Sequence, residues 1–152
     1  MSLELIRVTL WGYNRGLSFQ KIRVKKATVH GDVEVVVDMG GEDVVPHVAN
    51  ILKNDSNELV RHEAAFSLGQ MCLRSGIKPL EDATRNDPSL FVRHEAAVAL
   101  GVIGSQDEKE TLQKALEDSS EQVRDSAVVA LSNLKFMESL SKNEKFAKMT
   151  GG

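Results

Sequence analysis

The chain is poor in several residue types whose abundance marks common classes of protein. Its 152 residues include one cysteine, Cys72, which excludes a disulfide framework and favours a reducing, cytoplasmic location. No apolar run approaches the roughly 20 residues of a membrane span, so we expect no membrane partner. The start, Met1-Ser2-Leu3-Glu4, lacks the basic head and apolar stretch of a secretory signal, so no signal peptide is expected.

Charge of either sign is present but unevenly spread. The net charge is −3, of which residues 1–30 contribute +5 and the rest of the chain −8. Nucleic acid is not the expected partner of the basic segment, because +5 is modest and only Trp11 and Tyr13 could stack on bases. We expect this segment to form a charged solvent-facing surface or to contact the acidic region of a second subunit.

What the chain does contain is an internal repeat. The sequence LVRHEAA at 59–65 returns as FVRHEAA at 91–97, and a weaker third copy, QVRDSA, runs from 122 to 127. Val60 of the first copy corresponds to Val92 and Val123 of the others, so the period is about 32 residues. A repeat of this period is typical of a solenoid, in which each unit buries its apolar face against its neighbours.

Each copy of the repeat predicts a helix, because its apolar residues fall on one helical face. In the second copy that face comprises Val92, Ala96, Ala97, Leu100 and Ile103. Shorter apolar patterns precede the three copies, at residues 45–53, 77–84 and 109–117. The sequence therefore predicts three helix pairs over roughly residues 42–135. The predicted N-caps of their second helices are Asp55, Asp87 and Ser119.

The two ends of the chain do not follow the repeat. Residues 1–40 contain alternating and β-branched segments separated by turn signals, which predict a small β-meander covering the N-terminal end of the stack. A helix over 17–29 is the alternative. Residues 137–152 are polar and predict a short helix followed by a loose, partly disordered tail. The predicted fold is mainly α: an α-solenoid over 41–136 behind a β-rich segment.

Two kinds of residue recur in the repeats without being apolar. An arginine follows the valine of each copy and an aspartate precedes each copy: Arg61, Arg93 and Arg124, with Asp55, Asp87 and Asp118. We predict that they form a structural Asp–Arg ladder between repeats. Cys72, at the apolar end of the first copy's helix, is predicted to be a buried and inert thiol.

The His-Glu pairs are the candidate chemical groups. An α-helix turns by roughly 100° per residue, so His62 and Glu63, two and three positions after Val60, point away from the core face. His94 and Glu95 occupy the same place one repeat later, and the third copy lacks both, so the fold does not require them. Packed helices lie about 8–10 Å apart, so imidazoles from neighbouring helices could share a metal ion. His and Glu suit iron, zinc and manganese. The alternative interpretation is a solvated polar face.

The longer motifs, LVRHEAAFSLGQM at 59–71 and VRHEAAVALGVIG at 92–104, resemble those of deoxyhypusine hydroxylase. That enzyme is a HEAT-repeat, iron-dependent monooxygenase that completes hypusine on a translation factor. The resemblance covers roughly residues 42–135 and implies HEAT-like repeats, iron(II) as cofactor, and metal ligands at His62, Glu63, His94 and Glu95. The family has two such halves in one chain, whereas this chain supplies one. A full two-iron site would therefore need a homodimer with two His-Glu pairs from each subunit.

Three functions remain open on the sequence alone. The first is a scaffold that holds a protein or peptide on the concave face lined by the second helices. The second is a homodimeric di-iron monooxygenase acting on a lysine-derived amine side chain. The third follows from a general resemblance to HEAT-repeat phycobilin lyases. No phosphate loop or nucleophile motif occurs, so no catalytic residue is assigned. We predict a HEAT-repeat interaction module with a candidate His/Glu metal site.

Overall fold

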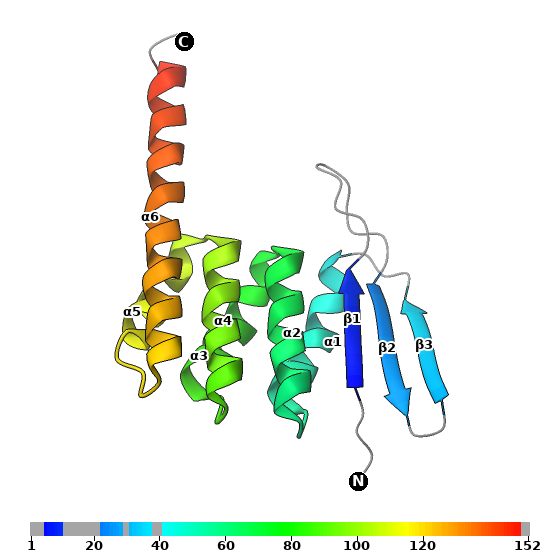
Figure 1. The fold of residues 1–152 in the computed structure, drawn as a ribbon. Helices are drawn as coiled ribbons and strands as arrows, with labels where there is room; N and C mark the ends of the chain where they lie inside the picture. Colours follow the sequence, from blue (N-terminus) through cyan, green and yellow to red (C-terminus); the bar gives the residue numbers. More distant parts are fainter. Residues whose placement is uncertain (1–4, 11–21, 29–30, 38–40, 150–152) are drawn as a thin grey trace.

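The helices of the protein form a stack of three antiparallel pairs. The computed structural model describes residues 5–10, 22–28, 31–37 and 41–149, with side chains from 41 to 142. The helices are α1 (Gly41–Asn54), α2 (Glu58–Met71), α3 (Ile77–Asn86), α4 (Leu90–Ile103), α5 (Lys109–Ala115) and α6 (Glu121–Met149). Helices α2, α4 and α6 stand side by side in one layer, and α1, α3 and α5 form the second layer (Figure 1). The predicted solenoid of three helix pairs is confirmed.

The starts of the second helices differ from the prediction by a few positions. Asn57 caps α2 and Ser89 precedes α4, so N-caps at Asp55 and Asp87 are wrong. Both aspartates instead accept a hydrogen bond from a backbone amide two residues on, at 2.8 and 2.9 Å, within the turn before the helix. Helix α6 likewise begins at Glu121, later than a cap at Ser119 requires.

The apolar face predicted for each second helix forms the core. Val92, Ala96 and Leu100 of α4 are completely buried in one cluster with apolar side chains from the neighbouring helices. Glycines bring the second helices close together: a Cβ added at Gly101 would lie 2.7 Å from the Cβ of Ala130 in α6. The second helices of successive repeats are therefore in close contact, which brings the recurring polar residues of neighbouring repeats near one another.

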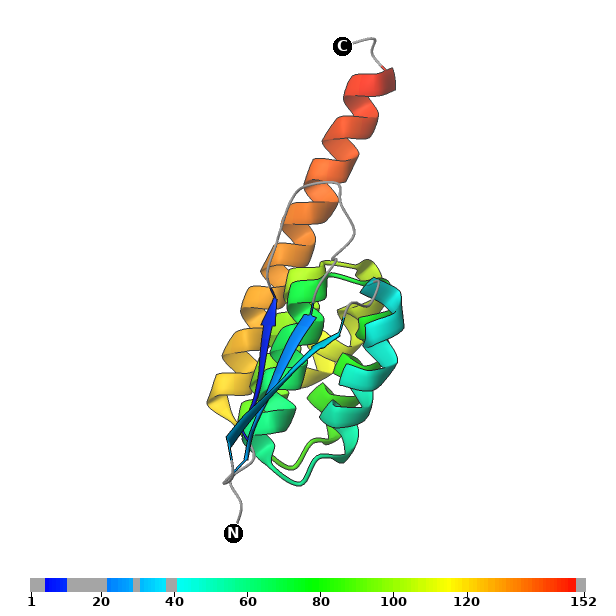
Figure 2. The same ribbon diagram turned by 90° about the vertical axis from the view of Figure 1, so that its right-hand side faces the viewer.

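The N-terminal segment is β-structured where it is described. Strands β1 (Leu5–Leu10), β2 (Ile22–Thr28) and β3 (Gly31–Val37) form an antiparallel sheet in the order β1-β2-β3. Leu5 pairs with Ala27, and Ile22 pairs with Val37. The alternative of a helix is excluded for residues 22–28. Strand β1 lies beside α2 on the side away from α4 (Figures 1 and 2).

The last helix continues through the boundary expected near residue 137. Helix α6 has 29 residues, against 14 in α2 and in α4, and its C-terminal half projects beyond the stack (Figure 1). Phe136 and Leu140, on this projecting part, are exposed. The last three residues, 150–152, where a tail is predicted, lie outside the described residues. Within the described part of the chain, no helix combines the length and apolar character that crossing a membrane requires.

The prediction of a buried Cys72 is wrong, because this residue ends a helix. Its backbone adopts a left-handed conformation with φ of 50° as the C-cap of α2, and the residue is exposed. The thiol donates a hydrogen bond to the carbonyl oxygen of Gly69, at 3.2 Å. The corresponding C-cap of α4 is Gly104, which adopts the same conformation without a side chain.

Candidate functional site

The His-Glu pairs lie near the start of two adjacent helices, on the surface away from the core. His62 and Glu63 follow the cap of α2, where the side chain of Asn57 accepts a hydrogen bond from the Leu59 amide at 2.9 Å. The sequence repeat places His94 and Glu95 at the same height on α4. None of the four side chains belongs to the apolar core, as the helical geometry predicts.

His62 lies between two carboxylates that come from different repeats. Its Nε2 is 3.3 Å from Oε2 of Glu95 on α4, and its Nδ1 is 3.7 Å from Oε1 of Glu63 on its own helix. The side chains of His62 and Glu95 are 30% and 12% exposed, so the contact between the repeats is the better shielded of the two. The structure therefore brings together three of the four predicted ligands: the imidazole of His62 and the carboxylates of Glu63 and Glu95.

His94 does not join that group but contacts the third repeat. Its Nδ1 lies 2.7 Å from Oγ of Ser126, and that hydroxyl donates to the carbonyl oxygen of Gln122, also at 2.7 Å. A serine hydroxyl has a single proton, and with that proton assigned to the carbonyl of Gln122, Nδ1 is the donor in the contact with Ser126. This assigns the lone pair of the neutral ring to Nε2.

Ser126 is a site residue that the sequence prediction missed. It occupies in the third repeat the position that Glu63 and Glu95 hold in the first two. The sequence showed that His-Glu is replaced by Asp-Ser in that copy. This change indicated only that two candidate metal ligands are absent there. The structure shows that the new serine fixes the ring of the preceding repeat's histidine.

The arrangement within one chain does not complete a metal site. Among residues 41–142, no group of three or more His, Cys, Asp or Glu side chains is placed to hold an ion. One pair of donors nevertheless has a suitable separation. Two ligands that are each about 2.0–2.2 Å from a common ion lie roughly 3 Å apart, and His62 Nε2 and Glu95 Oε2 are 3.3 Å apart.

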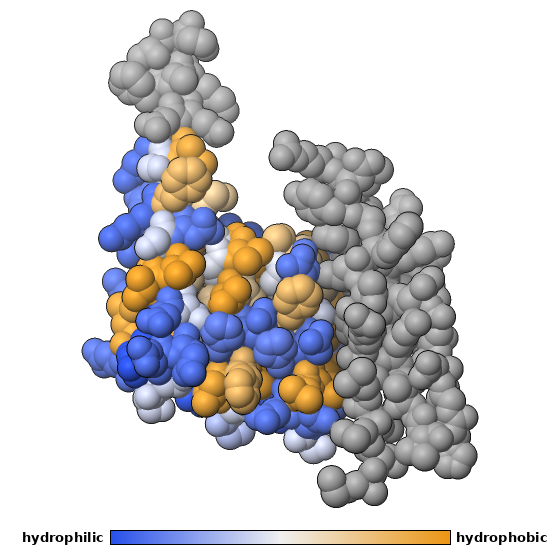
Figure 3. Space-filling model, viewed as in Figure 1, coloured by the Kyte–Doolittle hydropathy of each residue, from blue (hydrophilic) through white to orange (hydrophobic). Residues whose placement is uncertain are grey.

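Apolar side chains border the His-Glu residues on the same surface. Figure 3 shows a hydrophilic band across α2, α4 and α6 with hydrophobic areas on both sides of it. One turn before the band, Leu59 and Phe91 are more than half exposed, and one turn after it Phe66 and Val129 are also exposed. We call this surface the second-helix face. Exposed apolar side chains next to polar ones are typical of a surface that meets another protein.

The predicted Asp–Arg ladder is present and runs along a different edge of the same helices. Arg61 donates from Nε and Nη2 to both carboxylate oxygens of Asp87, at 2.8 and 3.0 Å, and from Nη1 to the carbonyl of Asp55. Arg93 makes the same bonds with Asp118 and with the carbonyl of Asp87. Each arginine therefore joins two repeats.

Burial makes the ladder more than a surface ion pair. The four side chains that form the two pairs are 6–13% exposed. The hydrogen bond with Asp87 is the main reason that the pKa of Arg61 is raised. Burial alone would raise the pKa of Asp118, but its hydrogen bonds from Arg93 and the Ser120 amide together lower it. The ladder thus stabilises the charged form of its members.

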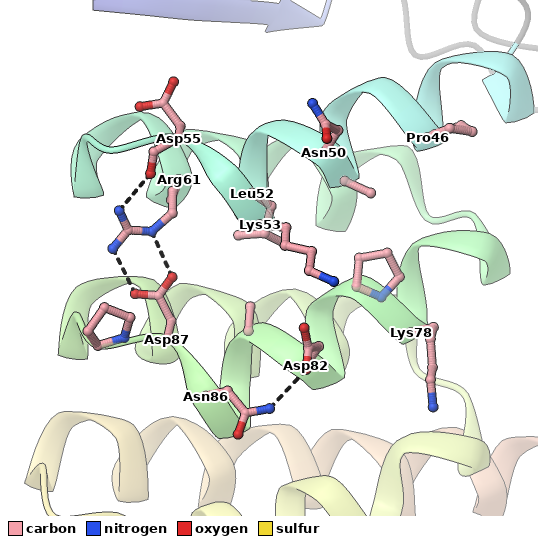
Figure 4. A pocket seen from close by; sticks show the side chains of 14 residues that line it. Pro46, Asn50, Leu52, Lys53, Asp55, Arg61, Lys78, Asp82, Asn86 and Asp87 are labelled. Carbon is pink, nitrogen blue, oxygen red and sulfur yellow. Dashed lines mark hydrogen bonds and ion pairs between the residues drawn. The ribbon is translucent and has the colours of Figure 1, made fainter.

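A groove of about 810 Å³ lies between α1 and α3, in the other helix layer. Figure 4 shows the Arg61–Asp87 pair at one end of it, and Asn86 bonded to Asp82. Lys53 and Lys78 also line the groove. Charges of both signs line this groove, and no histidine does, so it is separate from the candidate metal ligands.

Comparisons with known proteins agree with this architecture. A family model described as HEAT repeats matches residues 45–132, more than half of the chain. Among solved structures the chain is similar to human deoxyhypusine hydroxylase in complex with glycerol, with a TM-score of 0.61 and 28% identity. The similarity covers 64% of this chain and 34% of the hydroxylase chain, so this chain spans about a third of that enzyme. No curated protein sequence matches the chain.

Proposed function

Because the chain belongs to the HEAT-repeat family, we propose that it is an interaction module whose second-helix face carries half of a metal centre. A second copy of the chain would complete the centre. The observation that supports this proposal is the contact between His62 Nε2 and Glu95 Oε2, which joins two successive repeats at 3.3 Å. An ordinary hydrogen bond between the two groups has the same separation, so the metal content of the protein is what distinguishes a ligand pair from an ion pair.

The orientation of His94 also favours a ligand role. Metal-binding histidines usually donate the N–H of one ring nitrogen to a neighbouring oxygen, which fixes the ring and leaves the other nitrogen for the metal. The Nδ1 contact of His94 with Ser126 has this form. His62, Glu95 and His94 would therefore be the metal ligands, and Glu63 would adjust the basicity of His62.

The missing ligands would come from the second copy. A two-fold axis passing through the second-helix face would bring two His-Glu pairs from each chain together. The exposed apolar residues on both sides of the polar band, including Phe91 and Phe66, would then be buried between the copies. The acidic and imidazole groups would face one another, and a cation between them would offset their charge.

The similar structure suggests which metal and which chemistry the centre would use. The solved relative is named a hydroxylase, and the resemblance of the two motifs to its family implies iron(II). Iron held with open coordination positions would supply oxygen activation, and a lysine-derived amine side chain would be the substrate class. The protein residues would hold the ion, fix the histidine rings and exclude water from the interface.

Elemental analysis of the purified protein tests the proposal. We expect about one iron per chain in untagged protein prepared without chelator from iron-supplemented cells. His62→Ala and Glu95→Ala should each remove most of the metal. His47→Ala is the matched control, because His47 is an exposed histidine of α1 far from the second-helix face. Sedimentation should show a metal-dependent dimer.

Metal below about a tenth per chain, even after anaerobic reconstitution with iron(II), would contradict the metal centre. The second candidate function would then stand: a scaffold that binds a protein or peptide through the second-helix face. The exposed apolar residues Leu59, Phe91 and Val129 favour that function independently of any metal. Phe91→Asp should abolish partner binding in that case.

A further inference from the structure

The third arginine of the ladder has no carboxylate partner in the described part of the chain. Arg124 donates from Nη1 to the carbonyl of Asp118 at 2.7 Å, as Arg93 does to the carbonyl of Asp87. This bond holds its guanidinium where Arg61 and Arg93 hold theirs. Those two arginines use Nε and Nη2 to grip the aspartate of the next repeat. If the same geometry holds for Arg124, its Nε and Nη2 face the place that a fourth repeat would occupy.

The apolar contact between repeats is open at the same end. Ala97 of α4 is completely buried beside α6, whereas Val128, at the corresponding position of α6, is 52% exposed. Gly101 of α4 lies against Ala130, and its counterpart in α6 is the small and exposed Ser132. Helix α6 thus carries an arginine, an apolar residue and a small residue (Arg124, Val128 and Ser132) in the same order as α2 and α4, whose corresponding residues contact the next repeat.

We propose that this end of α6 docks a helical hairpin of HEAT type from a partner protein. The hairpin would carry an aspartate in the turn before its second helix and a small residue twelve positions later. Asp87 and Ala99 have this spacing in the second repeat, and Asp118 and Ala130 have it in the third. The aspartate would bind Arg124, and the small residue would lie against Ser132.

The contacts favour such a hairpin over other occupants. A free carboxylate would satisfy Arg124 but would leave Val128 exposed. A second copy stacked head to tail would have to offer Asp55, whose carboxylate bonds to no arginine among the described residues, although its backbone carbonyl accepts from Arg61. Strand β1 already lies beside α2 at that end of the stack (Figure 2). A hairpin from another protein would contact Arg124, Val128 and Ser132 together. It would repeat the interface that already forms between α2 and α4 and between α4 and α6.

Binding of a defined probe tests the proposal. The probe is a fluorescent synthetic peptide with the sequence of residues 104–135. It contains the required aspartate, Asp118, and the small residue twelve positions later, Ala130. Titrated with the full-length protein, the peptide should bind saturably by fluorescence anisotropy. Arg124→Gln in the protein or Asp118→Asn in the peptide should each weaken binding about tenfold, and the two together little further, because both remove the same charged hydrogen bonds.

Peptide binding that Arg124→Gln leaves unchanged would overturn the proposal, because the peptide would then be replacing the chain's own third repeat. Since a short hairpin can be poorly folded alone, a second variant duplicates residues 104–135 in tandem after Lys135 within the full chain. This extended chain should unfold at higher urea, and Arg124→Gln should cancel most of the gain. No gain, together with no peptide binding, would also overturn the proposal. So would a dimer of the natural chain that persists in chelator and that Val128→Asp dissociates while Phe91→Asp does not, since the occupant would then be a second copy.

Discussion

The Asp–Arg ladder and the His-Glu residues come from the same helices, and even from adjacent positions, yet the arginines and the histidines differ in burial and in hydrogen bonding. Arg61 and His62 are neighbours in the sequence. The arginine is buried against Asp87 with hydrogen bonds of 2.8 and 3.0 Å, whereas the histidine is 30% exposed. The comparison teaches that a residue type that recurs in a repeat protein shows only that it occupies the same position on each helix. Burial and bonding decide whether that position maintains the fold or remains available for another task.

The number of copies agrees with this distinction. The ladder arginine is present in all three repeats, including the last, whereas the His-Glu pair is present in two. A structural contact is needed at every junction of the stack. A binding site needs only the repeats that surround the ligand, and the third repeat contributes Ser126 instead. Three predictions test this division between the two sets of residues, and a fourth, at Gly101, tests the close helix spacing on which both sets depend.

The largest effect is expected from breaking the ladder inside the stack. Arg93→Ala should lower the free energy of unfolding by about 3 kcal/mol, because Asp118 would remain buried without its counter-charge. Urea denaturation followed by circular dichroism measures the change. The control is Arg124→Ala at the open end, which should cost less than about 1 kcal/mol. Equal costs at the two arginines would contradict the structural role assigned to the ladder.

The close spacing of the second helices should be the next most sensitive feature. Gly101→Ala should cost about 2 kcal/mol, since the new Cβ would lie 2.8 Å from the Cα of Ala130 and the backbone would have to move. Gly41→Ala at the start of α1 is the control, where the nearest atom is a flexible Leu73 methyl group at 3.4 Å. A thermal midpoint unchanged by Gly101→Ala would show that the helices are not so close.

The ladder should also make stability depend on pH at the acid end. The pKa of Asp118 is lowered in the folded protein, so its stabilisation is complete above its ordinary value of about 3.9. It is lost as the pH falls through the lowered value. Wild-type protein should therefore exceed Asp118→Asn in stability at pH 6, and the difference should shrink below about pH 4. A difference that stays constant down to pH 2 would contradict this.

The smallest effects on stability are expected for the candidate ligands. His62→Ala and Glu95→Ala should each change the metal-free unfolding free energy by less than about 0.5 kcal/mol, because neither side chain belongs to the apolar core. Urea denaturation in the presence of chelator is the measurement. A loss of several kcal/mol in either variant would place these residues with the ladder, and the distinction between the two sets would fail.

Much of the fold was predictable because the repeat restricts it strongly. Two nearly identical copies and a third weaker one predicted the helix pairs, and the helical period predicted which residues face the core. The same period directed His62 and Glu63 away from it. The starts of the second helices were misjudged because Asp87 looks like an N-cap in the sequence, but its carboxylate is already engaged by Arg61 and by the Ser89 amide.

The candidate site was predictable only in part, because its geometry depends on contacts between repeats. The four ligand candidates followed from a pattern, but the pattern gave no reason to expect that Glu95 reaches His62 while His94 turns to Ser126. Cys72 was misplaced for a related reason. Its apolar neighbours suggested burial, and the left-handed turn that exposes it exists only because α2 ends there.

By itself, the sequence determined the solenoid, its three helix pairs, its core face and the residues that recur outside that face. These follow from periodicity, which acts over one helix and needs no knowledge of neighbours. The tertiary structure decided which recurring residues are buried, which carboxylate lies beside His62 and which hydroxyl lies beside His94, and which face of α6 no described residue covers. Those properties depend on the spacing of helices that lie one repeat apart in the chain, where close approach at Gly101 and the reach of each side chain set the partners.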